Sequence, residues 1–192
     1  MSYATTEITS AEIPSDNPVH QRLYFPYEEA AKRIHGRVLE LGCGWGRGVE
    51  KLIAACDHFT GLDKNEALIA ALQAKHPNHY FNTVDLPSLV EFADNSFDFV
   101  VTFQVIEHIQ DDHRFLQEAH RVLKPGGKLF LTTVNKDYSL SRNPWHVREY
   151  KTSELRGLMQ KYFCKLETWG IDGNEKVWAY YEQNKISVNR IM

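Results

Sequence analysis

The fold is decided by the stretch Val38-Leu39-Glu40-Leu41-Gly42-Cys43-Gly44-Trp45-Gly46-Arg47-Gly48, in which an apolar run breaks into closely spaced glycines. Helical spacing of apolar residues resumes after it, so the pattern predicts a strand, a tight turn and a helix over about residues 46–55. The glycines permit backbone angles closed to other residues and remove side chains that would keep a ligand from the main chain. The helix amides would favour a carboxylate or phosphate there. An ordinary strand-to-helix turn is the alternative for these glycines taken alone.

The segments that follow alternate between strand and helix patterns. Strands are predicted at 58–63, 80–84, 96–103, 128–134 and 164–169, and helices at 65–75, 112–123 and 153–162. Residues 124–127 read as a turn, and residues 175–192 have apolar residues near helical spacing. This alternation predicts an α/β fold, a Rossmann-like, doubly wound, mostly parallel sheet with helices on both faces.

The ends of the predicted strands carry the candidate ligand-binding residues. In such sheets a ligand lies beyond the carboxyl ends of the strands, where the strand order reverses. The strands end at Glu40, Asp63, Asp85 and Gln104. Asp63 stands 21 residues after Gly42, a position typical of an acid that accepts hydrogen bonds from ribose hydroxyls. The alternative is that Asp63 caps the following helix.

Four motifs together resemble the class I S-adenosylmethionine-dependent methyltransferases, in particular the type 11 methyltransferase-domain family. They are Val38 to Gly46; Gly61-Leu62-Asp63; Phe97-Asp98-Phe99-Val100 with Val105-Ile106-Glu107-His108-Ile109; and Leu123-Lys124-Pro125-Gly126-Gly127-Lys128-Leu129. Their order and spacing agree with the family from about residue 37 to 134. The family's seventh, antiparallel strand has no clear counterpart. The chain is therefore expected either to end in a helix or to be a piece of a longer one.

The resemblance implies S-adenosylmethionine as cofactor, with S-adenosylhomocysteine as product. The methionine part would lie by Glu40 and the glycines, and the ribose on Asp63. Asp85 and Leu86 would border the adenine, and Gln104 would flank the sulfonium. The predicted cofactor-binding residues are Glu40, Gly42, Cys43, Gly44, Gly46, Asp63, Lys64, Asp85, Leu86 and Gln104.

Two other functions compete with a methyltransferase. A nicotinamide dinucleotide domain also opens with strand, glycines and helix, but its pattern is GxGxxG, whereas the glycines at 42, 44 and 46 give GxGxG. The second competing function is a methyltransferase-like module that binds the cofactor without catalysis. The intact glycines and Asp63 argue against a degenerate site.

The polar and aromatic segment 137–150 follows the last core strand and is predicted to contact the methyl acceptor. The predicted acceptor-contacting residues are Tyr24, Trp145, His146 and Tyr150. His108 and His146 are the candidate general bases, and no metal is expected. Alternatively, Glu107 and His108 only shape the pocket, Trp145 pins the loop and His146 bonds a carbonyl.

The acceptor is predicted to offer an oxygen or a carbon. The family's amino-methylating members carry an Asp/Asn-Pro-Pro-Tyr signature, and Phe103-Gln104-Val105-Ile106 stands in its place here. We expect a small-molecule, sugar- or lipid-linked acceptor, with protein or RNA as the alternative substrates.

Composition predicts one cytoplasmic domain. The chain has 192 residues and a formal net charge of -3, which gives no reason to expect a nucleic-acid partner. No membrane span or signal sequence is evident, and the three scattered cysteines are expected to be reduced thiols. We expect a mobile arm at 1–17 and one methyltransferase domain at 18–192, with lid helices at 18–34 divided by Pro26, a cofactor-binding core at 37–134 and an acceptor-side part at 137–192.

Overall fold

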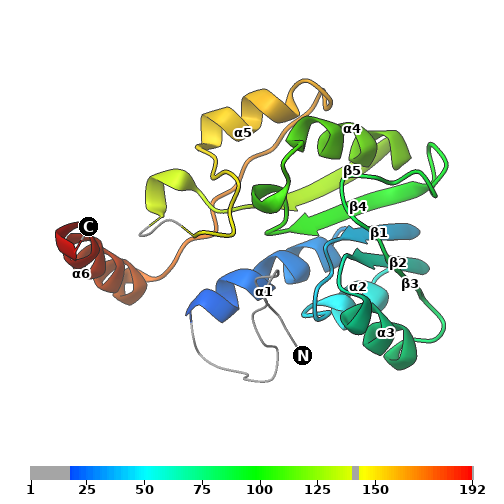
Figure 1. Ribbon diagram of the computed structural model, residues 1–192, viewed down its shortest axis with the longest axis horizontal. Helices are drawn as coiled ribbons and strands as arrows, with labels where there is room; N and C mark the ends of the chain where they lie inside the picture. The colour runs from blue at the N-terminus through cyan, green and yellow to red at the C-terminus, as the bar shows by residue number, and fades with distance from the viewer. Residues whose placement is uncertain (1–17, 140–142, 192) are drawn as a thin grey trace.

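The computed structural model describes residues 18–139 and 143–191, so the predicted arm at 1–17 lies outside the described residues. A five-stranded parallel sheet of order β3-β2-β1-β4-β5 forms the centre (Figure 1). Its strands are β1 Arg37–Leu41, β2 His58–Asp63, β3 Tyr80–Thr83, β4 Phe97–Phe103 and β5 Leu123–Thr132. The order reverses between β1 and β4, which places the switch point at their carboxyl ends.

Helices cover both faces of the sheet (Figure 1). One face carries α1 Pro18–Ala31, α2 Val49–Ile53 and α3 Glu66–Lys75, and the other carries α4 Asp112–Val122 and α5 Thr152–Met159. Successive strand residues point to opposite faces, so Val38 packs in the first core and Leu39 in the second. The predicted doubly wound α/β fold is confirmed.

The strand predicted at 164–169 is wrong. These residues form no regular element, and Trp169 is 83% exposed. A strand needs a neighbour to satisfy its backbone groups, and within the described residues β5 pairs only with β4. The chain continues instead to α6 Glu175–Ile191, whose Trp178 ring lies 5.6 Å from Tyr138.

β5 begins earlier than the predicted residue 128. Phe97 pairs with Leu123, but Phe99 already pairs with Lys128, so residues 124–127 are left over as an irregularity in the ladder. The predicted turn therefore lies inside the strand as a bulge. Such a bulge re-aims the strand without ending its pairing.

The two helices nearest the glycine turn differ from the predictions. α1 is one helix, although Pro26 lies inside it and was expected to divide it. Pro26 leaves the carbonyl of Arg22 without its helical donor. Arg22 is exposed, so a water molecule can donate to this carbonyl instead.

α2 begins at Val49, later than the predicted residue 46, because Gly46 has a φ of 76°, which is outside the helical range. With only five residues, it adds little of the anion-binding character expected of a longer helix.

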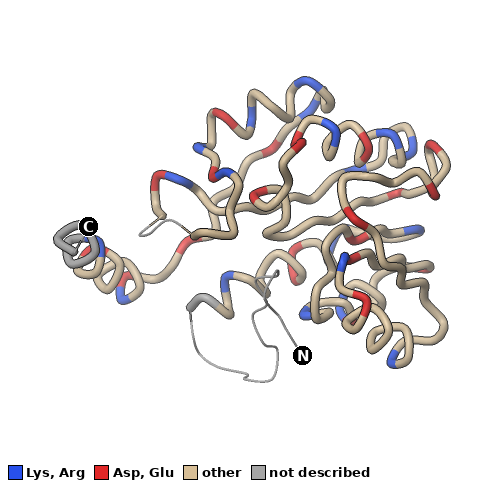
Figure 2. Tube along the Cα trace, in the orientation of Figure 1, with Lys and Arg blue, Asp and Glu red and all other residues tan. Residues whose placement is uncertain are grey.

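Acidic and basic residues are mixed along the surface helices, while the strands are mostly uncharged (Figure 2). This distribution agrees with the near-neutral net charge of -3. Among the described residues, no helix combines the length and apolarity that a membrane crossing requires.

Candidate functional site

The glycine turn between β1 and α2 bends toward the end of β2. Gly42 and Cys43 donate their backbone N–H groups to the Leu62 carbonyl at 2.8 and 2.9 Å. Gly42 has a φ of 77°, and a Cβ there would lie 2.4 Å from Val105 Cγ2, so no larger residue fits. A Cβ on Gly44 would meet nothing within 4 Å. A ligand can therefore approach the main chain at Gly44.

Asp63 ties the glycine turn to the end of β2. The side chain is 9% exposed, and its two oxygens accept from the backbone N–H groups of Gly44 and Asn65, each at 2.9 Å. The cap of α3 is Asn65, whose side chain accepts from Leu68 N at 3.2 Å. Asp63 is therefore not the helix cap. Each carboxylate oxygen has a further lone pair with which to accept a ligand hydroxyl.

Glu40 is a buried acid that lacks one hydrogen-bond partner. It has no exposed surface, its Oε1 accepts from the Tyr27 hydroxyl at 2.8 Å, and its Oε2 has no partner among the described residues. Burial raises the pKa of Glu40 to about 7. A buried acceptor without a donor is an incomplete polar site. Glu40 therefore suits a ligand group that donates hydrogen bonds.

The Tyr27 ring on α1 packs against the glycine turn. A Cβ on Gly48 would lie 2.0 Å from Tyr27 Cγ, so the ring occupies the space that any other residue at position 48 needs. Nearby, Arg47 contacts His20 Nδ1 at 2.8 Å. Tyr27 was not among the residues predicted from the sequence to shape the site.

The other predicted cofactor residues also follow the strands. Cys43 is 3% exposed and packs in the core, so only its backbone faces the turn. Lys64 and Asp85 are exposed, and Leu86 is half-buried. Gln104 has a φ of 59° and donates from Nε2 to Thr132 Oγ1 at 3.2 Å.

Residues 39–131 match the family model described as a methyltransferase domain. Over 165 residues, 81% of the chain, 37% are identical to a probable S-adenosylmethionine-dependent methyltransferase of Mycolicibacterium smegmatis. Residues 39–131 therefore form a methyltransferase domain that is related to the S-adenosylmethionine-dependent methyltransferases. The cofactor of this family is S-adenosylmethionine.

The chain is also similar to a more distant relative and to a solved structure. A ubiquinone biosynthesis O-methyltransferase of Paracidovorax citrulli is 29% identical over 81% of this chain and 75% of its own length. The crystal structure of the PH0226 protein of Pyrococcus horikoshii matches with a TM-score of 0.70 at 21% identity, covering 86% of this chain and 90% of that one, which shows the fold alone. The chain spans 63% of the length of the Mycolicibacterium relative and 58% of two other mycobacterial relatives.

The residues at the strand ends fit S-adenosylmethionine. The unpartnered Oε2 of Glu40 suits an ammonium group. The open side of Gly44 leaves room beside the main chain, and Asp63 keeps acceptor capacity for two hydroxyls. The unpartnered Oε2 of Glu40 and the open side of Gly44 are properties of the structure that the sequence motif does not show.

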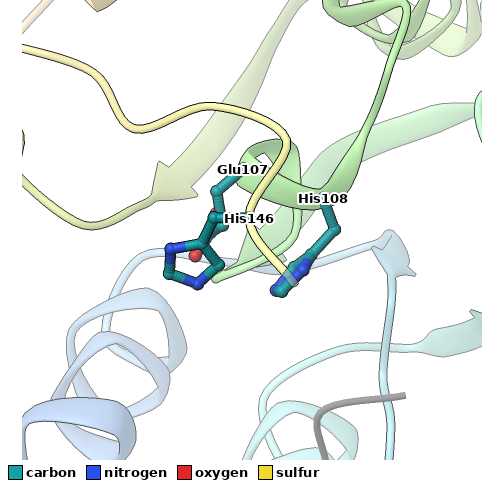
Figure 3. Close-up of side chains that lie close together, drawn as sticks. All are labelled: Glu107, His108 and His146. Carbon is teal, nitrogen blue, oxygen red and sulfur yellow. The ribbon is translucent and has the colours of Figure 1, made fainter. Parts of the chain in front are cut away.

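The loop after β5 brings the two candidate bases together. The ring centroids of His108 and His146 are 5.0 Å apart, although the residues are separated by 38 positions in the sequence. Val147 and Arg148 donate their backbone N–H groups to the Glu107 carbonyl at 2.8 and 3.2 Å, which fixes the loop on the turn η1 Ile106–His108. Figure 3 shows Glu107 and His108 extending from this turn and His146 from the loop.

Of these three residues, Glu107 was not predicted to bind a ligand or to act as a base. It is 1% exposed, and its Oε2 accepts from Thr133 Oγ1 at 2.7 Å. Burial raises the pKa of Glu107, while its hydrogen bonds and the two histidines oppose that shift. Its place beside His108, directly after a buried strand, was the available sequence signal.

The predicted acceptor residues separate into exposed and buried members. Trp145 is 47% exposed. Tyr150 is 3% exposed and its hydroxyl donates to Asp112 at 2.8 Å, so it anchors the loop to α4. Tyr24 lies on α1 with Lys51 Nζ 5.7 Å from its ring centroid, which places it at the contact between α1 and α2.

A cavity of about 390 Å³ opens behind the loop, beside α5. It is lined by Lys136, Arg148, Glu149, Tyr150, Glu154 and Leu158. None of the predicted cofactor-binding residues borders it, so this cavity is separate from the cofactor site.

Proposed function

We propose that this chain transfers a methyl group from S-adenosylmethionine to an oxygen of a small-molecule, sugar- or lipid-linked acceptor. The observation that carries the proposal is the pairing of His108 with His146 beyond the end of β4. The similarity to a ubiquinone biosynthesis O-methyltransferase supports an oxygen acceptor. The alternative acceptor atom is a carbon, which would take the methyl group in the same reaction.

The strand-end residues bind and orient the cofactor in this proposal. Glu40 accepts from its ammonium group, Asp63 from its ribose hydroxyls, and Gly44 lets it lie against the main chain. Bound S-adenosylmethionine supplies an activated methyl group: the acceptor oxygen bonds to the methyl carbon while the carbon–sulfur bond breaks, and its electron pair stays on sulfur. Alignment of the two reacting atoms supplies much of the acceleration.

The histidines are placed to accept the proton of the acceptor hydroxyl. His108 Nδ1 lies 2.9 Å from the Trp145 carbonyl oxygen, and a carbonyl can only accept, so the neutral ring carries its proton on Nδ1. His146 Nδ1 likewise donates to the carboxylate oxygen Oε1 of Glu149 at 2.8 Å. The lone pair of each neutral ring is therefore on Nε2, the atom that a general base uses. In the structure, Nε2 of His146 accepts from Asn143 Nδ2 at 3.1 Å, so this hydrogen bond is exchanged when His146 takes up a proton.

His146→Ala is expected to spare cofactor binding while slowing methyl transfer. Among the described residues, His146 contacts Asn143 and Glu149 on its loop and the ring of His108 on η1. Its loss should change the Kd of S-adenosylmethionine less than about twofold and lower kcat about 100-fold if it serves as the base. Calorimetry and a labelled-methyl assay measure the two effects. A loss of cofactor binding as complete as that of Asp63→Ala would place the loop in the cofactor site.

A methyl-transfer screen tests the acceptor class. The chain is incubated with methyl-labelled S-adenosylmethionine and separate small-molecule, lipid, RNA and protein fractions, and the Asp63→Ala chain serves as control. We expect label in the small-molecule or lipid fraction. Label confined to RNA or protein would overturn the acceptor class, and cofactor binding without label in any fraction would support a non-catalytic binding module.

A further inference from the structure

Glu107, His108 and His146, here called the Glu107 cluster, bring one carboxylate and two imidazoles to one point (Figure 3). One possible ligand atom from each residue lies within 4.8 Å of the others. An ion such as Zn²⁺, at about 2.1 Å from each ligand, holds its ligand atoms about 3 to 4 Å apart. The cluster therefore needs only a small inward movement of its side chains to bind an ion.

Each member of the cluster also forms a hydrogen bond with a residue outside the cluster. His108 Nδ1 donates to the Trp145 carbonyl at 2.9 Å, and His146 Nδ1 donates to Glu149 Oε1 at 2.8 Å. Thr133 Oγ1 donates to Glu107 Oε2 at 2.7 Å. Metal-binding histidines typically donate their other N–H to a carbonyl or carboxylate, and metal-binding carboxylates are themselves hydrogen-bonded. The partners of the cluster follow this arrangement.

Because Nδ1 donates in both bonds, the lone pair of each ring is on Nε2. In the structure Asn143 Nδ2 lies 3.1 Å from His146 Nε2, so it donates a hydrogen bond to that lone pair. Metal binding exchanges this bond for a metal–nitrogen bond. Asn143 Oδ1 also accepts from Trp145 N at 3.0 Å, so metal binding displaces an amide that the loop otherwise holds in place.

Burial favours an ion over water at this point. Glu107 is 1% exposed and the His146 side chain 9% exposed. A carboxylate removed from water is stabilised by a nearby cation, and two imidazoles with one carboxylate form a ligand set found in catalytic zinc sites. Three protein ligands leave one position open.

We propose that the Glu107 cluster binds a divalent first-row transition-metal ion of the zinc type and presents its open position to the acceptor. The catalytic part of this inference rests on the proposed methyl transfer. A metal-bound acceptor hydroxyl loses its proton more readily: its O–H bond breaks, the proton passes to solvent, and the oxygen stays on the metal as the nucleophile. The proposal replaces the metal-free site expected from the sequence, and in it the histidines are ligands instead of general bases.

Cobalt(II) absorption tests the site directly, without activity. The tag-free chain is stripped with a chelator and titrated with Co²⁺, and Zn²⁺ binding is measured by calorimetry. We expect close to one ion per chain, with the intense visible absorption of a site of low coordination number. Glu107→Gln and His146→Asn should each weaken binding at least about tenfold. His58→Asn is the matched control, because His58 is exposed at the opposite end of β2.

Folding and function are separated by two further measurements. Circular dichroism and S-adenosylmethionine affinity confirm that each variant folds, and His108→Gln provides a third, less buried substitution in the cluster. Binding that is equally strong in all three cluster variants, or no binding by the unsubstituted chain, overturns the metal site. Methyl transfer that persists undiminished after chelation overturns its catalytic role. Co²⁺ binding at the cluster in a chain that methylates no acceptor upholds the site and rejects the proposed function.

Discussion

Asp63→Ala is expected to weaken S-adenosylmethionine binding about 100-fold, because it removes charge-assisted hydrogen bonds that are each worth about 1.5 to 3 kcal/mol. Asp63 has two tasks in the proposed site. It accepts the ribose hydroxyls, and it holds the glycine turn through Gly44 N at 2.9 Å. Calorimetric titration of both chains with S-adenosylmethionine and S-adenosylhomocysteine measures the loss.

The control for this substitution is Asp57→Ala. Asp57 is an exposed acid that directly precedes β2, so it stands at the end of the strand opposite Asp63. It should leave the affinity unchanged. Circular dichroism confirms that the Asp63→Ala chain is folded, since Asn65 N also loses its acceptor. Equal affinity of the Asp63→Ala chain, or tighter binding of NAD than of S-adenosylmethionine, would contradict the assignment of the strand ends.

The parts of the fold that depend on local pattern were predictable. β2 occupies its predicted range, and α3 starts one residue after its predicted beginning because Asn65 is the cap. The meeting of Gly44 with Asp63 followed from the rule that parallel strands present their carboxyl ends on one edge. Strand periodicity and chain topology were sufficient for both.

The parts that depend on distant partners were not predictable. A strand at 164–169 required a neighbour that the described sheet does not supply. The bond from Tyr27 to Glu40 depends on how α1 is rotated against the sheet. The approach of His146 to Glu107 depends on the path of a loop, to which the aromatic residues of that loop gave no guide. Side-chain contacts across elements are set by tertiary packing, which periodicity does not encode.

Glu40→Gln is expected to remove a large pH dependence of stability. The pKa of Glu40 is about 7 in the folded chain against the ordinary value of 4.5, chiefly because of burial. The folded state therefore favours the protonated acid. Its contribution is fully present below pH 4.5 and is lost as the pH rises through 7. The difference corresponds to roughly 3 kcal/mol in the free energy of unfolding.

Urea unfolding of both chains at pH 5, 6, 7 and 8 measures this effect. The free energy of unfolding of the unsubstituted chain, minus that of Glu40→Gln, should fall by roughly 2 to 3 kcal/mol across the range. Glu66→Gln is the control, since Glu66 is exposed in the first turn of α3. A difference that stays constant with pH would show that Glu40 is ionised in the folded chain throughout.

The same acid links cofactor binding to proton release. An ammonium group placed at the unpartnered Oε2 favours the ionised carboxylate, so binding lowers the pKa of Glu40 from about 7. At pH 6.5 the chain should therefore release a fraction of a proton for each S-adenosylmethionine bound. Calorimetry in two buffers of different ionisation enthalpy detects this release, which Glu40→Gln should abolish. Proton uptake by the unsubstituted chain would place the ammonium group elsewhere, because a cation beside Glu40 can only drive its proton off.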